Sequence, residues 1–122
     1  MNSYTLSFGE ITILEPNLAE VIINEGIELD ENMVLEYTEF LNDNLDTPYY
    51  LIINKKHSYS YTFGAQKTLA NLEFIGAYAV VATNLGAVMS TETLVRIGDN
   101  PNLNLQIFGS REEALEWLET QY

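Results

Sequence analysis

The sequence contains no cysteine, and basic residues are scarce. Without cysteine the chain has no disulfide, thiolate metal ligand or cysteine nucleophile, which suits a reducing cytosol. Five Lys and Arg stand against eighteen Asp and Glu, for a formal net charge of −13. A negative field of this size repels nucleic acid and anionic membranes, so neither is expected as a partner. A basic protein surface, or a small ligand held by local contacts, is compatible with it.

Long apolar runs are also missing. No stretch approaches the ~20 residues of a membrane span, and the first ten residues lack a basic region followed by an apolar one. We therefore expect a cytoplasmic protein without membrane contact. Its 122 residues are 47% hydrophobic and 19% charged, which predicts one globular domain over residues 1–122.

The start of the chain has the alternating pattern of strands. Residues 4–8 and 11–14 alternate between polar and apolar side chains, and Gly9-Glu10 between them predicts a turn. These two runs are expected to form a hairpin. A third apolar run over residues 21–23 follows Pro16-Asn17.

Four helices are indicated by apolar spacings of three and four residues. The first follows an N-cap at Asp30, and the second covers residues 63–72. The third begins between residues 85 and 90 and ends at Gly98, which we expect to form a left-handed C-terminal cap. The last follows Ser110, whose spacing to Glu113 forms a capping box.

The remaining apolar segments predict strands between these helices. Residues 49–53 and 75–82 are almost continuously apolar, as in strands buried on both faces. Residues 103–108 alternate strictly, as in an edge strand. The expected fold is an open α/β structure whose mixed, mostly parallel sheet starts with an N-terminal β-hairpin and alternates with helices through right-handed crossovers.

The end of the chain resembles that of the small bacterial STAS-like domains, which are related to anti-anti-sigma factors and to a broader STAS or CRAL-TRIO-like group. A strand closing in Ile107-Phe108 continues through Ser110-Arg111-Glu112-Glu113 into Ala114-Leu115-Glu116-Trp117-Leu118. The opening Tyr4-Thr5-Leu6 and the strand Ala79-Val80-Val81 are similar too. The resemblance covers nearly the whole chain and implies a STAS-like topology.

This resemblance implies a non-enzymatic regulatory domain that binds a partner protein. In the family, a serine at the start of the second helix is phosphorylated within an Asp-Ser-Ser-Gly motif. Aligning that glycine on Gly64 places Tyr61, Thr62 and Phe63 on the three preceding positions, of which only Thr62 retains a hydroxyl in the acceptor position. Thr62 is therefore the candidate phosphoacceptor.

Basic residues gather around the carboxyl end of one predicted strand and the following helix. Open α/β sheets bind ligands outside the carboxyl ends of their strands, and helix N-termini favour anions. The alternative is that these are ordinary solvated loop residues. The candidate anion or partner site comprises Lys55, Lys56, His57, Ser58, Ser60 and Lys67.

The sequence gives little support for a catalytic, metal or cofactor site. His57 could act as a base toward Ser58 or Ser60, but no Gly-x-Ser-x-Gly elbow accompanies it. Residues 30–32 and 42–46 lack the glycine of a calcium loop. No glycine-rich phosphate loop is present either. We expect no catalytic residue, metal or cofactor.

Four tyrosines lie near the same loop, and they either line a pocket or interface or belong to the core. They are Tyr49, Tyr50, Tyr59 and Tyr61. Two functional hypotheses follow. The first is a regulatory or protein-interaction domain, monomeric or homodimeric, with an unidentified protein partner. The second is a binder of a small apolar or anionic, lipid-like ligand at the strand ends beside the lysines and tyrosines.

Overall fold

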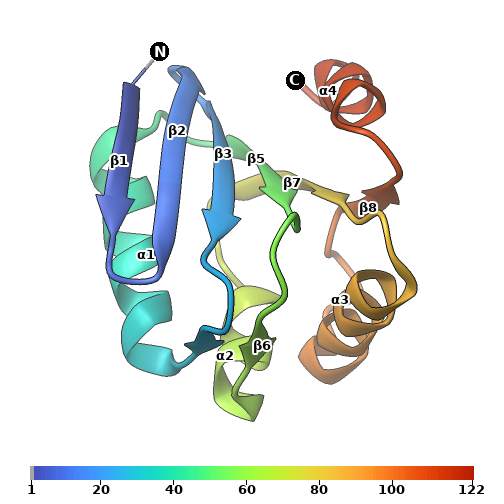
Figure 1. Cartoon of the computed structure of the whole chain (residues 1–122). Helices are drawn as coiled ribbons and strands as arrows, with labels where there is room; N and C mark the ends of the chain where they lie inside the picture. The colour runs from blue at the N-terminus through green and yellow to red at the C-terminus, as the bar shows by residue number, and fades with distance from the viewer. Residues whose placement is uncertain (1) are drawn as a thin grey trace.

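The N-terminal hairpin and the later strands join in one six-stranded sheet (Figure 1). The structure is a computed structural model and describes residues 2–122. Strands follow one another across the sheet in the order β1-β2-β3-β5-β7-β8. They are β1 (Asn2–Leu6), β2 (Gly9–Glu15), β3 (Leu18–Ile23), β5 (Tyr49–Asn54), β7 (Ile75–Val81) and β8 (Leu105–Phe108).

Both pairing directions occur in this sheet. The pairs β1–β2 and β2–β3 are antiparallel, whereas β3, β5, β7 and β8 pair in parallel. This confirms the expected mixed, mostly parallel sheet with an N-terminal hairpin. The carboxyl ends of the four parallel strands consequently lie along one edge.

Helices cover both faces of the sheet. They are α1 (Glu31–Asn44), α2 (Phe63–Leu69), α3 (Leu85–Gly98) and α4 (Arg111–Glu119). The first three pack on one face, where Tyr37, Leu69 and Leu94 contribute to the larger core. Helix α4 packs on the other face through Ala114 and Leu118. Three layers result, with the sheet in the middle.

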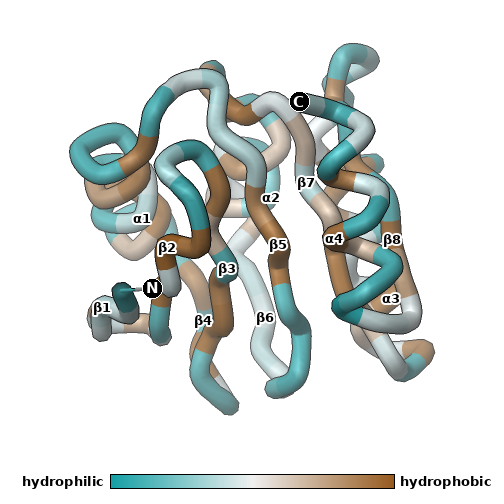
Figure 2. The backbone as a smooth tube through the Cα atoms, turned by 90° about the horizontal axis from the view of Figure 1, so that it is seen from above, coloured by the Kyte–Doolittle hydropathy of each residue, from teal (hydrophilic) through white to brown (hydrophobic). Residues whose placement is uncertain are grey.

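The two faces explain the continuous apolar runs of the central strands. In β5, Tyr49 and Leu51 belong to the core beneath α1 to α3, while Tyr50 and Ile52 belong to the core beneath α4. Because each face meets a helix layer, both sets of alternating side chains are apolar. Figure 2 shows β5 as a hydrophobic segment that gives way to a hydrophilic loop before β6.

A second, two-stranded sheet was not predicted from the sequence. Strand β4 (Glu28–Leu29) pairs in parallel with β6 (Ser60–Tyr61) below the carboxyl edge of the main sheet (Figure 1). Two-residue strands are too short to show a periodicity. Their pairing is nevertheless important, because it positions the segment containing Tyr59 and Tyr61.

The first hairpin turns two residues earlier than predicted. Ser7 and Phe8 form the turn, and Gly9 is already the first residue of β2, opposite Leu6. Gly9 is needed for close approach, since a Cβ there would overlap the backbone of Ile22 in β3. Gly9 is therefore required by the close packing of β2 against β3 and not by the turn.

Helix α2 is shorter than expected and ends at Leu69. Two side chains donate hydrogen bonds to carbonyl groups of its last turn. The Tyr78 hydroxyl donates to Leu69 O at 2.9 Å, and Asn71 Nδ2 donates to Lys67 O at 2.8 Å. These bonds replace the helical ones that would extend it. Leu72 still packs against the core from outside the helix.

Gly98 does not form the predicted left-handed cap. It is the last residue of α3, and Asp99 adopts the left-handed conformation with φ 49°. The role of Gly98 is instead to let α3 approach α2, because a Cβ on Gly98 would overlap the Cβ of the buried Ala70. Gly98 is needed because it has no side chain, and not because of its backbone conformational freedom.

Replacing two glycines of α3 with alanine should change the free energy of unfolding differently. Gly98→Ala forces a steric overlap with Ala70 and should lower the free energy of unfolding by about 1–3 kcal/mol. Gly86→Ala adds a Cβ no closer than 3.4 Å to Asn84 Oδ1. Since alanine is the better helix former, it should be neutral or stabilise by up to about 1 kcal/mol. Urea denaturation of both variants tests this, and equal effects would contradict it.

Candidate functional site

The candidate site lies where β5 and β7 end. Lys55 directly follows β5, and Asn84 follows β7 by three residues and caps α3. The carboxyl edge of a parallel sheet is the usual ligand-binding edge in open α/β folds. The loop from β5 to β6 and the first turn of α3 meet there.

Strand pairing continues beyond β5 and directs Lys55 inward. Lys55 N donates to Val81 O at 3.0 Å, which extends the β5–β7 pairing by one residue. Side chains alternate along a strand, so Lys55 projects to the same face as Ile53. That face is covered by α1 to α3. The lysine therefore enters the interior and not solvent.

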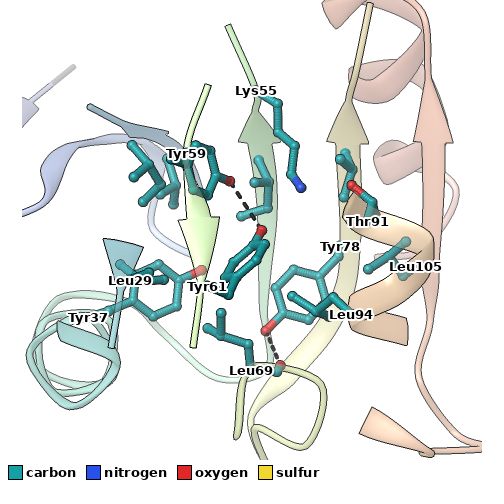
Figure 3. A pocket seen from close by; sticks show the side chains of 14 residues that line it. Leu29, Tyr37, Lys55, Tyr59, Tyr61, Leu69, Tyr78, Thr91, Leu94 and Leu105 are labelled. Carbon is teal, nitrogen blue, oxygen red and sulfur yellow. Dashed lines mark hydrogen bonds between the residues drawn. The ribbon is translucent and has the colours of Figure 1, made fainter. Parts of the chain in front are cut away.

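The Lys55 side chain is buried without a counter-charge. It is only 6% exposed, and no carboxylate in residues 2–122 forms an ion pair with it. Its Nζ lies 5.4 Å from the ring centroid of Tyr59 and 5.1 Å from that of Tyr61. Figure 3 shows the amine between these two rings and the side chains of Thr91 and Tyr78. Ring electrons give partial compensation for the buried charge.

Lys55 reaches into a small, mainly apolar cavity between the sheet and the helices. The volume of this inner cavity is about 50 Å³. Tyr78 and Tyr37 close its lower part, and the hydroxyls of Tyr59 and Tyr61 lie 3.3 Å apart at its side (Figure 3). The lining residues are Val21, Ile23, Leu29, Tyr37, Ile53, Lys55, Tyr59, Tyr61, Leu69, Tyr78, Val80, Thr91, Leu94 and Leu105.

A wider outer groove adjoins the inner cavity. Its volume is about 330 Å³, and Lys55 and Tyr59 line both spaces. The groove runs along the first turn of α3, where Asn84 Oδ1 accepts from Ala87 N at 2.9 Å. Helix geometry leaves the amides of Leu85 and Gly86 without partners inside the helix. The groove residues are Glu25, Lys55, Lys56, His57, Ser58, Tyr59, Asn84, Gly86, Ala87 and Ser90.

The structure brings four of the six predicted site residues together. Those that line the groove are Lys55, Lys56, His57 and Ser58. Ser58 is fixed by its amide, which donates to Glu25 Oε1 at 3.0 Å. Ser60 and Lys67 lie elsewhere: Ser60 is an exposed residue of β6, and Lys67 is exposed in the last turn of α2.

The tyrosine cluster divides between the site and the core. Tyr59 and Tyr61 line the inner cavity, whereas Tyr49 is a core residue and Tyr50 packs on the opposite face of the sheet. Sequence reasoning missed Tyr37, Tyr78 and Thr91, which come from α1, β7 and α3. It also missed the first turn of α3, although an asparagine three residues after a buried strand is a usable signal for a capped helix at the ligand-binding edge.

Thr62 occupies the N-cap of α2, at the start of the second helix. Its hydroxyl accepts from Ala65 N at 3.2 Å. The carboxylate of Glu31 lies beside Gly64, 2.5 Å from where a Cβ would be. A helix N-terminus favours a phosphate, whereas the negative charge of Glu31 opposes one. Thr62 therefore stays a predicted phosphoacceptor.

Burial alters the acid–base properties of the cavity groups. Desolvation lowers the pKa of Lys55 from 10.5 to about 8. Desolvation also raises the pKa of Tyr61 to about 12 and places those of Tyr37 and Tyr59 well above their usual value. The tyrosines thus remain neutral hydroxyls at physiological pH, while part of the Lys55 population is a neutral amine.

No cluster of metal-ligating side chains occurs within residues 2–122, and no helix in that range has the length and hydropathy to cross a membrane. Comparison with protein-family models, curated proteins and solved structures gives no significant match for this chain. The functional assignment therefore depends on the geometry of the site.

Replacing Lys55 should stabilise the protein in a pH-dependent manner. Below about pH 8 the lysine is charged in both states, and the folded state bears the full cost of burial. Between pH 8 and 10.5 the unfolded chain binds more protons, so wild-type stability rises with pH. Lys55→Met should therefore be more stable at pH 7 by about 1–3 kcal/mol, and this difference should shrink by about 2 kcal/mol at about pH 9.5.

Denaturant unfolding of both proteins at the two pH values measures this difference. Changes in tyrosine ionisation common to both proteins cancel in the comparison. The exposed Lys67 provides the matched control, because Lys67→Met should give no pH-dependent difference. A Lys55→Met difference that stays constant with pH would contradict the burial of a charged amine.

Proposed function

We propose that this protein binds a small molecule with an apolar body and an anionic group such as a carboxylate. The observation behind this proposal is Lys55, a buried amine without a counter-charge in the described residues, at the junction of an apolar cavity and a polar groove. A buried charge is costly when it is unpaired. An anionic ligand would supply the missing partner.

Each part of the site matches one part of such a ligand. The apolar end would enter the inner cavity between Leu29, Leu94 and Leu105. The anionic group would lie in the outer groove, where Lys55 and the free amides at the start of α3 favour negative charge. The local positive charge matters because the protein as a whole is strongly acidic.

Size also favours a ligand that spans both spaces. An engineered apolar cavity of about 150 Å³ holds one benzene ring, so the inner cavity of about 50 Å³ is too small for a complete ligand. The groove of about 330 Å³ is within the range of small-molecule sites. Together they suit a molecule with a slender apolar end and a larger polar end.

Octanoate is a suitable probe for the proposed function. Titration calorimetry should detect its binding to the wild type, and Lys55→Met should weaken that binding at least about tenfold, because a charge-assisted contact is lost. The uncharged analogue octanol should bind both proteins similarly. Lys67→Met, which removes an exposed lysine outside the site, should bind octanoate as the wild type does.

Two results would contradict this proposal. One is the absence of octanoate binding to folded wild-type protein, with no small-molecule adduct in native mass spectrometry of the purified protein. The other is equal octanoate affinity of the wild type and Lys55→Met. The octanol comparison separates a loss of charge pairing from a general loss of the cavity.

We also propose a second function, as a regulatory domain of STAS-like type that docks a protein partner. Support comes from the sequence resemblance and from exposed apolar side chains at the starts of α2 and α3. Phe63 is 69% exposed, Leu85 is 73% exposed and Met89 is 55% exposed. Aromatic residues and Met, such as Phe63 and Met89, are enriched in protein interfaces. A partner with a basic rim would complement the net charge of −13.

Cross-linking and affinity capture test this second function. The double variant Phe63→Ser, Leu85→Ser should lose any reproducible partner. Leu35→Ser, which replaces an exposed leucine of α1, should retain it. Partner capture unaffected by the double variant would exclude these two side chains as anchors.

A further inference from the structure

Lys55 combines three features that an amine nucleophile requires. It is buried and free of ion pairs within the described residues, so no carboxylate holds it in the charged form. It lines the inner cavity, into which its amine points beside the rings of Tyr59 and Tyr61 (Figure 3). Lys55 also lines the outer groove, through which a ligand would approach it. The other two lysines are exposed and lack these features.

We propose that Lys55 captures small apolar aldehydes or ketones as a reversible imine. This inference rests on the binding site of the proposed function and specifies a chemistry for it. The reactive carbonyl carbon would meet Lys55 Nζ at the mouth of the inner cavity, which would hold the end of the apolar chain. The process is stoichiometric capture, and no turnover is implied.

The chemical step is balanced without any co-reactant. The neutral amine attacks the carbonyl carbon, and transfer of one proton from nitrogen to oxygen gives a carbinolamine. Loss of the hydroxyl group with the second nitrogen proton releases one water and forms the C=N bond. Neither oxidation nor reduction occurs. Water leaves through the outer groove, and excess water reverses the reaction.

The surroundings favour the neutral, nucleophilic form of the amine. The titratable groups that line the inner cavity with Lys55 are the hydroxyls of Tyr59, Tyr61 of β6, Tyr37 of α1 and Tyr78 of β7, and burial raises the pKa of each. Desolvation lowers the pKa of Lys55 to about 8. An amine with this pKa is roughly one-tenth neutral at pH 7, compared with well under about one-thousandth for an ordinary lysine. Desolvated lysines of this kind serve as imine-forming groups in enzymes.

The charged groups of the outer groove do not pair with Lys55. Glu25 lines the groove, but its carboxylate accepts from Ser58 N. Lys56 and His57 line the same groove and add no negative charge. Within the described residues, the groove therefore offers Lys55 no carboxylate that forms an ion pair with it.

The test is reductive trapping of an imine on the intact protein. Wild-type protein is treated with hexanal and sodium cyanoborohydride near neutral pH, and the sites of alkylation are mapped over time by fragmentation mass spectrometry. Lys55 should be alkylated at least about tenfold faster than Lys56 or Lys67, which serve as internal controls. Alkylation of Lys55 at the same rate as these lysines, or slower, would overturn the proposal.

Competition and a charge-retaining variant separate this inference from the binding proposal. Excess octanoate should slow alkylation of Lys55 and leave that of Lys67 unchanged. Lys55→Arg keeps the positive charge but forms no such imine, so this variant should show only the slow alkylation of Lys56 and Lys67. If octanoate binds the wild type and Lys55 is not trapped, capture is wrong and the binding proposal stands. Rapid trapping without octanoate binding would instead support capture and contradict the binding proposal.

Discussion

Lys55 N donates a hydrogen bond to Val81 O, and the site depends on this one extension of the β5–β7 pairing. Strand geometry past the end of β5 directs the Lys55 side chain to the face covered by α1, α2 and α3. Had the pairing stopped at Asn54, the lysine would have been free to turn toward water as its exposed neighbour Lys56 does. A backbone constraint thus places a charged group in an apolar interior.

Placing the amine there costs stability, and the surrounding residues offset only part of that cost. The rings of Tyr59 and Tyr61 contact the ammonium group, but ring electrons compensate a buried charge less completely than a carboxylate does. Arg111, in contrast, has a counter-charge: on the α4 side of the sheet it forms an ion pair with Glu20 at 3.0 Å. Asn54 donates a hydrogen bond to the same carboxylate. An unpaired, perturbed lysine beside a cavity is typical of a functional site.

The short β4–β6 sheet completes this site. It holds the segment after β5 beside β4, the strand that precedes α1, and so brings Tyr59 and Tyr61 over the lysine. The first turn of α3 supplies the other wall and contributes unpaired amides beside the basic residues. Three separate segments therefore bring two lysines and unpaired helix amides together in one small region of a protein whose overall field repels anions. Local contacts and not net charge would select the ligand.

Local patterns in the chain were enough to predict the order of the four helices and of the main-sheet strands, the mostly parallel sheet, the doubly buried β5 and β7, and the caps at Asp30 and Ser110. These features follow from periodicity and from side-chain hydrogen bonds within three residues. The packed layers were needed to show that Gly9 and Gly98 serve close packing, that β4 pairs with β6, and which lysine is buried. In the sequence Lys55 and Lys56 are adjacent and identical in type. Only the pairing of β5 with β7 and the helices above them distinguish the two, because burial is a property of the packed layers and not of the segment.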